Sequence, residues 1–136
     1  MWTWKSYVTN SGLLVQEWYR SVDRLVWLDF KTLLIFLDGQ PPSSWTRPYV
    51  GTLKNECEKL FEIRFDHGNV EYRPIGFYSG KKEFTILFFA TERDSKFEPP
   101  TACEIAQRHR DEIEKDEEKS REFWFEKRDS EGDKGK

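Results

Sequence analysis

The chain has 136 residues, of which 37% are hydrophobic, 35% charged and 16% aromatic, and its formal net charge is -3. A chain of this length fits one domain and buries roughly two-thirds of its unfolded surface, so a core can form without disulfides or metals. Residues 1–110 carry 15 basic and 14 acidic side chains, whereas residues 111–136 carry 7 and 11. Because dedicated nucleic-acid binders are usually more basic, this balance argues against a strongly basic surface.

The cysteines and the apolar runs bear on the cellular compartment of the protein. Cys57 and Cys103 match no metal-ligand spacing, and we expect two reduced thiols packed in the interior. The first residues lack the basic and apolar regions of a signal peptide. No apolar run reaches the roughly 18 residues that a membrane-spanning helix needs. We therefore predict a cytoplasmic protein that makes no membrane contact.

The N-terminal part of the chain predicts one strand and two helices. Aromatic and polar residues alternate over residues 1–9, which is typical of a strand. Apolar residues then recur at helical spacing over residues 14–22. Asp23 is placed to cap a second helix, and Gly39 followed by two prolines ends it. The two helices form either a hairpin or one bent helix.

The middle of the chain predicts an ordered loop and then a meander. Residues 40–52 form the loop, which its aromatic side chains hold in place. Strands are expected over residues 59–66, 70–78 and 83–91, joined by turns of hairpin type. The third strand is apolar on both faces, so we expect it at the centre of the sheet or under helices.

A last helix is predicted after Pro99 and Pro100. Thr101 and Glu104 have the spacing of a capping box, and apolar residues continue on one face as far as Ile113. The complete order is β-α-α-β-β-β-α, which predicts an α+β domain over residues 1–115. In that domain the N-terminal strand and the antiparallel meander share one sheet.

Residues 116–136 are predicted to form a charged C-terminal extension. Its first part is either a solvated extension of the last helix or disordered. The aromatic residues Phe-Trp-Phe at 123–125 either dock onto the domain, near the N-terminal strand, or await a partner. From Glu126 onward we expect disorder.

Four segments in order resemble the RelE/ParE toxin superfamily, with most similarity to its HigB-like, phage-derived branch. They are LKNECEKLFEIRF, VEYRPIGFY, EFTILFFATERD and EIAQRHRDEI. In that branch a strand with Leu-x-Glu-Ile/Leu-Arg precedes a Tyr-Arg strand, an apolar strand that ends in basic residues, and a helix. The resemblance covers roughly residues 4–115.

The resemblance implies a toxin of a type II toxin–antitoxin module. Many such toxins are endoribonucleases (mRNA interferases) that cut mRNA in the ribosomal A site and use no metal or other cofactor. Their partner in the HigB-like branch is typically a helix-turn-helix antitoxin protein. The resemblance therefore implies a metal-independent, RNA-binding hydrolase.

Metal-free cleavage by 2′-hydroxyl attack needs a base, an acid and cations that stabilise the phosphate. Arginine suits the last task, because its planar guanidinium binds phosphate through two N–H groups and stays charged. The resemblance implies catalytic roles for Arg64, Arg73 and Arg93. A turn near Gly68 also puts Arg64 and Arg73 almost opposite each other on neighbouring strands, with their side chains about 5 Å apart at Cβ.

Further residues extend the predicted RNA site or are left outside it. Phosphate-binding lysines and base-stacking tyrosines are proposed at Lys54, Lys96, Tyr72 and Tyr78. His67 is predicted to be a turn residue only. His109 lies on the apolar side of the last helix and is predicted to be packed rather than catalytic.

Some residues favour a different function. Arg64 has Glu62 and Glu71 as neighbours, and ion pairs between them would contribute only about 0.2–1 kcal/mol each. Glu92 stands where relatives often carry lysine. The alternatives are a non-catalytic binding module of the same fold that acts on a protein target, a decayed toxin, or an unrelated α+β interaction domain.

Overall fold

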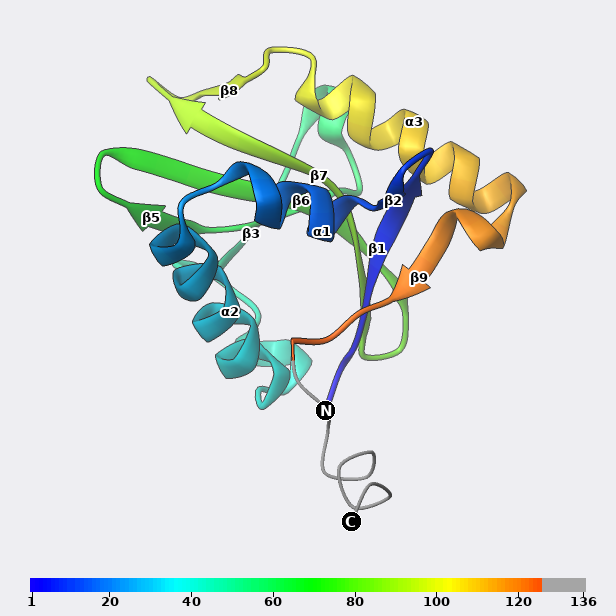
Figure 1. The fold of residues 1–136 in the computed structure, drawn as a ribbon, viewed down its shortest axis with the longest axis horizontal. Helices are drawn as coiled ribbons and strands as arrows, with labels where there is room; N and C mark the ends of the chain where they lie inside the picture. Colours follow the sequence, from blue (N-terminus) through cyan, green and yellow to red (C-terminus); the bar gives the residue numbers. More distant parts are fainter. Residues whose placement is uncertain (126–136) are drawn as a thin grey trace.

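The computed structural model describes residues 1–125, which form an α+β fold as predicted. In this range three α-helices accompany a mixed sheet of nine strands (Figure 1). The elements are β1 (Thr3–Thr9), β2 (Gly12–Leu13), α1 (Leu14–Ser21), α2 (Arg24–Asp38), β3 (Val50–Thr52), β4 (Phe61–Ile63), β5 (Phe65–His67), β6 (Val70–Gly80), β7 (Glu83–Arg93), β8 (Lys96–Glu98), α3 (Ala102–Lys115) and β9 (Ser120–Glu122).

The sheet has the order β2-β1-β7-β6-β4-β3, with β5 paired to β6, β8 to β7 and β9 to β1. β1 runs parallel to β7, and the other pairs are antiparallel. β4 and β5, which are separated at Arg64, both pair with β6, and β6 pairs with β7. The sheet is larger than predicted, because short strands of two or three residues are added at its edges.

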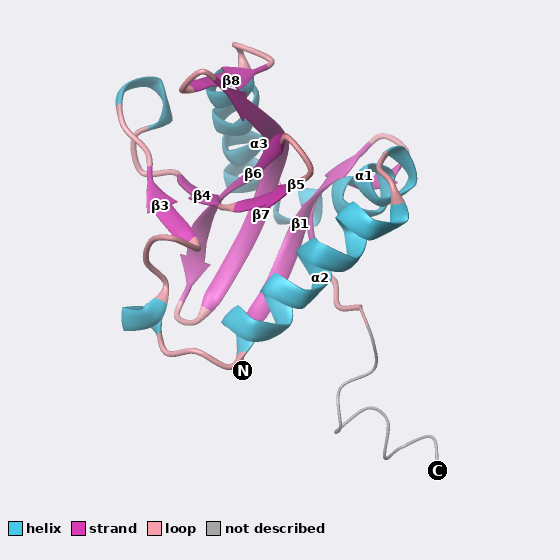
Figure 2. Ribbon diagram, turned by 90° about the vertical axis from the view of Figure 1, so that its left-hand side faces the viewer, coloured by secondary structure: helices cyan, strands magenta, loops and turns pink. Residues whose placement is uncertain are grey.

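Helices cover both faces of the sheet (Figure 2). α1 and α2 lie on one face, over a core that includes Trp4, Phe30 and Phe84. α3 lies on the other, over Ile75 and Leu87. β7 pairs with β1 on one side and with β6 on the other and supplies side chains to both cores, which confirms its predicted central place.

The ends of α2 follow the capping signals in the sequence, whereas the start of α3 does not. The Asp23 carboxylate accepts a hydrogen bond from the backbone N–H of Leu25 at 2.8 Å, and Gly39 follows the last residue of α2, both as predicted. The capping box predicted for α3 is wrong. Thr101 has φ -88° and ψ 11°, so its backbone is not extended as in a typical N-cap, and its side chain makes no capping hydrogen bond.

The two cysteines form a disulfide, which corrects the expectation of reduced thiols. Cys57 ends a short 3₁₀ turn and Cys103 lies in the first turn of α3. Their Cα atoms are 5.0 Å apart, although 46 positions separate them in the chain. A separation of this length does not reveal spatial proximity, so the sequence could not predict the bond.

The segment after α3 returns to the sheet, so the docking alternative for Phe-Trp-Phe is the one observed. β9 pairs with β1, and the backbone N–H of Phe123 donates to the carbonyl oxygen of Trp4 at 3.0 Å. The Trp124 ring stacks on Trp4, and the Phe125 ring lies 5.1 Å from that of Trp27. The disorder predicted from Glu126 onward falls outside the described residues.

Candidate functional site

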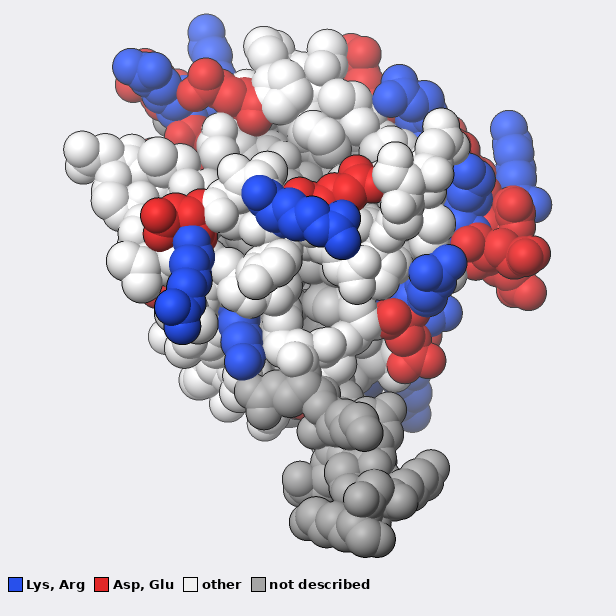
Figure 3. Space-filling view, in the orientation of Figure 1, with Lys and Arg blue, Asp and Glu red and all other residues white. Residues whose placement is uncertain are grey.

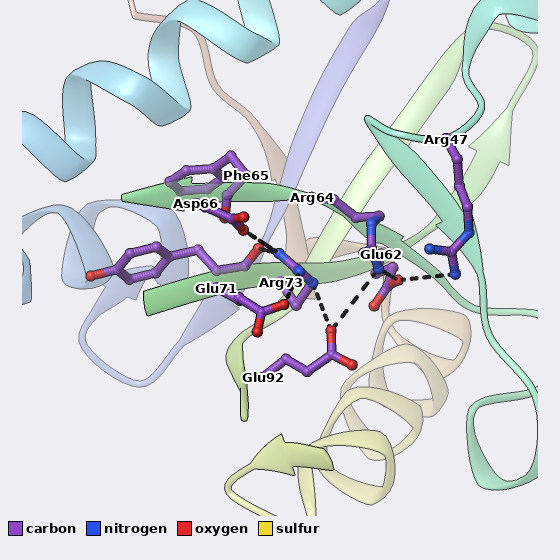
Figure 4. Close-up of polar contacts among 9 residues, drawn as sticks. Arg47, Glu62, Arg64, Phe65, Asp66, Glu71, Arg73 and Glu92 are labelled. Atoms are coloured by element: carbon purple, nitrogen blue, oxygen red, sulfur yellow. Dashed lines mark hydrogen bonds and ion pairs between the residues drawn. The ribbon is translucent and has the colours of Figure 1, made fainter. Parts of the chain in front are cut away.

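Arg64 and Arg73 lie opposite each other on one face of the sheet. Glu62 pairs with Ile75 and Phe65 pairs with Tyr72, so the intervening register places Arg64 across from Arg73. Both guanidinium groups lie in one cluster of charged side chains (Figure 4). The predicted cross-strand arrangement of these two arginines is confirmed.

Arg73 is enclosed by acceptors. Its Nε donates to Glu92 at 2.9 Å, its Nη2 to Glu71 at 2.8 Å and its Nη1 to Asp66 at 3.2 Å. Two main-chain carbonyl oxygens also accept from Nη1. The side chain is only 2% exposed. Arg73 therefore holds three carboxylates from three strands in place, and little of its own surface is open to a ligand.

Arg64 and Arg47 share the buried carboxylate of Glu62. Arg64 Nη1 donates to Glu62 Oε2 in a short contact and lies 4.0 Å from Glu92. Arg47 Nη2 lies 3.9 Å from the same oxygen, which is too long for a hydrogen bond, and its side chain is 64% exposed. The two guanidinium groups are therefore neighbours, and Arg47 is the loosely held one.

A cavity of about 700 Å³ lies beside the cluster, between α2, the turn over residues 46–49 and β5. We call it the first cavity. It is lined by Leu33, Arg47, Pro48, Tyr49, Arg64, Phe65, Asp66 and Arg73. Three of these side chains are cationic and one is anionic, and two carry aromatic rings. Because Arg73 is 2% exposed and already paired with carboxylates, the cations that this cavity offers to a ligand are Arg47 and Arg64.

A second cavity, of about 620 Å³, has the opposite charge balance. It is lined by Arg47, Thr52, Leu53, Glu62, Arg64, Glu71, Glu92, Asp94, Ser95 and Phe97. Four carboxylates face two arginines there. Arg47 and Arg64 line both cavities and mark the boundary between them.

The wider surface shows no continuous basic area on the face drawn in Figure 3. Within the described part of the chain, most lysines and arginines on this face lie close to acidic side chains. The formal net charge of the chain is -3, so long-range attraction of a polyanion is weak. Recognition of phosphate would therefore depend on short-range contacts in a cavity.

The remaining predicted site residues lie away from the first cavity. Arg93 pairs with Lys96 in the β7–β8 hairpin and lines a further cavity that also contains Glu71, Glu92, Asp94 and Glu98. Lys54 is exposed next to the 3₁₀ turn that ends at Cys57.

The two predicted base-stacking tyrosines are both packed on other rings. Tyr72 stacks on Phe65 with ring centroids 5.1 Å apart, and burial raises the pKa of its phenol. Tyr78 lies at the other end of β6, against Trp45 and Phe84, where burial likewise raises its pKa.

Both histidines have structural partners. The His67 Nδ1 lies 2.7 Å from a carboxylate oxygen of Asp29, so this residue ties β5 to α2, which the prediction of a simple turn residue missed. His109 is packed as predicted. Its ring stacks on the Tyr7 ring, with the two centroids 3.7 Å apart, and its Nδ1 lies 2.8 Å from the carbonyl oxygen of Leu87.

The cluster around His109 contains two shifted pKa values. Burial lowers the pKa of His109. Burial, together with a hydrogen bond that Tyr7 donates to Glu112 at 2.7 Å, raises the pKa of Tyr7 to about 12. Both side chains are therefore held in their neutral forms near neutral pH.

Sequence reasoning missed Arg47 and Tyr49, which line the first cavity from the loop before β3. A loop has no periodicity that assigns a side chain to a face. The available signal was local, namely a cation and a ring two residues apart in the segment RPY.

Comparison with known proteins finds no matching family model, no similar curated protein and no similar solved structure. Within residues 1–125 no group of three or more His, Cys, Asp or Glu side chains is arranged to hold a metal ion. In the same range, every helix is too short or too polar to cross a membrane.

Proposed function

We propose that this chain is a RelE/ParE-type toxin of the HigB-like branch, which acts in a toxin–antitoxin module as a ribosome-dependent mRNA endoribonuclease. The motifs in LFEIRF and VEYRP support the proposal, as does the chain order of the long elements: strand, two helices, meander and helix. The proposed partners are a helix-turn-helix antitoxin and mRNA in the ribosomal A site.

The observation that carries the proposal is the composition of the first cavity. Guanidinium groups bind phosphate, and aromatic rings stack on bases whatever the sequence. Arg64 and Arg47 supply the first group and Tyr49 the second, all beside one cavity. Asp66 is the carboxylate among its lining residues and is therefore our candidate for the base that accepts the 2′-hydroxyl proton.

The proposal divides the predicted arginines by role. Arg64 stabilises the charge that develops on the scissile phosphate, a contribution often worth about 10²–10³ in rate. Arg73 acts as a positioning residue, because it fixes Asp66, Glu71 and Glu92 around the site.

Induced expression in a bacterial host tests the proposal. We expect growth arrest with cuts at defined codon positions in mRNA, mapped by sequencing of RNA 5′ ends. Arg64→Gln should abolish both effects. Arg121→Gln, which changes an exposed arginine on the strand at the far edge of the sheet, should retain them. Arrest with intact mRNA, or cuts that persist in Arg64→Gln, would contradict the proposal.

A second candidate is a non-catalytic binding module of the same fold. The enclosure of Arg73 and the four carboxylates of the second cavity favour it, because both disfavour a polyanion. Growth arrest with intact mRNA that depends on Glu92 and Asp94 would support this second function and point to a protein target.

The proposal places the protein in the cytoplasm, where thiols are usually kept reduced. The disulfide between Cys57 and Cys103 counts against that location. Thiol labelling of the protein in cells quenched rapidly with acid measures which state is present.

A further inference from the structure

The turn that carries Arg47 and Tyr49 is held at both ends. The indole N–H of the buried Trp45 donates to the carbonyl oxygen of Leu37 at 3.1 Å. The backbone N–H of Tyr49 donates to the carbonyl oxygen of Thr46 at 3.0 Å. The carbonyl oxygen of Tyr49 accepts from the backbone N–H of Arg64 at 2.8 Å. The backbone of this turn is therefore fixed against α2 and against Arg64, which lies between β4 and β5.

Arg47 is the arginine of the site that is free to meet a ligand. Its 3.9 Å approach to Glu62 is not a hydrogen bond, and most of its side chain is exposed. Arg47 and Arg64 flank the Glu62 carboxylate in an ion cluster of three arginines and four carboxylates, whose net charge is -1. The cluster therefore attracts a phosphodiester through the N–H donors of Arg47 and Arg64 and not through an excess of positive charge. Each of its two non-bridging oxygens would accept a hydrogen bond from one of these guanidinium groups.

Tyr49 offers ring surface next to these cations. The residue is 39% exposed, and the Phe36 ring supports its ring from the side, with centroids 5.0 Å apart. Phe65 also lines the cavity and is itself backed by Tyr72. Base–aromatic stacking contributes about 1–3 kcal/mol for each base.

We infer that the first cavity is a subsite for a single nucleotide, with its phosphate held by Arg47 and Arg64 and its base stacked on Tyr49. The inference rests on the proposed function and names the group that this cavity recognises. Its volume of about 700 Å³ lies within the roughly 300–1,000 Å³ of typical ligand sites. The carboxylates of the second cavity repel any further phosphate on that side, so the subsite takes one phosphate.

Calorimetric titration of the purified chain tests the subsite. The probes are the four nucleoside 5′-monophosphates, adenosine and inorganic phosphate. We expect at least one monophosphate to bind about tenfold or more tightly than both adenosine and phosphate, because stacking and the ion pairs act together. Equal binding of phosphate and all nucleotides would reduce the site to a simple anion site and overturn the inference.

Matched variants locate the binding. Arg47→Gln and Tyr49→Leu should each weaken the best monophosphate about tenfold, and Arg47→Lys should weaken it less. Arg121→Gln and Tyr19→Leu, which change exposed residues elsewhere, should bind as the unchanged chain does. Because Arg47 and Tyr49 are both substantially exposed, their variants should keep the circular dichroism spectrum and the thermal midpoint.

The outcomes separate the subsite from the enzyme. Nucleotide binding that depends on Arg47 and Tyr49, without any mRNA cleavage, would keep the subsite and overturn the nuclease. Codon-specific cleavage without nucleotide binding, or binding unchanged in both variants, would overturn the subsite and leave the nuclease.

Discussion

β6 and β7 are both 11 residues long and pair over most of their length, yet their two ends are built differently. At the end where β6 leads into β7, Tyr78 and Phe84 lie among tryptophan rings. At the other end, Arg73 and Glu92 lie among further charged side chains. One end is an aromatic core and the other an ion cluster.

The two ends differ in how much charge they bury. At the aromatic end the buried carboxylate of Asp38 accepts from the backbone N–H of Trp2 at 2.9 Å and from the indole N–H of Trp4 at 3.1 Å. At the charged end a nearly buried guanidinium needs three carboxylates around it. Since burying charge is costly even when it is paired, such a cluster is better explained by a function than by folding.

The aromatic end is expected to dominate stability. Trp4 is 1% exposed and contacts the rings of Trp45, Phe84 and Trp124. We expect Trp4→Ala to lower the free energy of unfolding by about 3–5 kcal/mol, measured by urea denaturation. Tyr19→Ala, at an exposed ring, is the control and should cost less than about 1 kcal/mol. Equal losses for the two variants would break the comparison.

At the charged end, removal of one arginine should cost less than Trp4→Ala but still be large. Arg73→Met removes the cation that pairs with Glu71 and leaves Glu92 with only the 4.0 Å contact to Arg64, so we expect a loss of about 3 kcal/mol in the same urea measurement. The double variant Arg73→Met/Glu92→Gln should recover part of that loss, because one uncompensated charge is gone. A loss below about 1 kcal/mol in the single variant would show that Arg73 does not anchor the cluster.

A polar cluster on the α3 side sharpens the comparison, because its inner members, Tyr7 and His109, are neutral and its charged pair, Glu112 with Lys119, is partly exposed. The pKa of Tyr7 is raised to about 12, so the folded state holds the phenol proton more firmly than the unfolded state does. Its contribution, roughly 3 kcal/mol, is complete below pH 10 and is lost as the pH rises through about 12.

Urea denaturation across this alkaline range measures the effect, together with an absorbance titration of the phenolates. Tyr7→Phe cannot ionise and serves as the control, so its stability should fall less steeply. The same alkaline slope in both proteins would mean that other groups cause the loss.

The sequence predicted the parts of the fold that are set by local pattern. The turn at Gly68 fixes the register between β5 and β6, so the approach of Arg64 to Arg73 followed from residue spacing. Asp23 and Gly39 marked the ends of α2 for the same kind of reason. Short strands such as β3 and β9 could not be predicted, since two or three residues carry no period and pair only through tertiary contacts.

The candidate site was predictable only in part. Arg64 and Arg73 were found, but the sequence could not show that Arg73 would be enclosed by carboxylates from three strands, because that depends on the pairing of β6 with β7. Arg47 was missed because its position depends on how one loop folds against the sheet.

The bond between Cys57 and Cys103 closes the intervening chain into a covalent ring. This ring contains β4 to β8, and with them Arg64 and Arg73, whereas Arg47 lies outside it. The exposed Gly68–Asn69 turn belongs to the ring, so a protease that nicks the chain there leaves both fragments joined. The nicked protein should therefore run as one band in a denaturing gel without a thiol and as two bands after reduction.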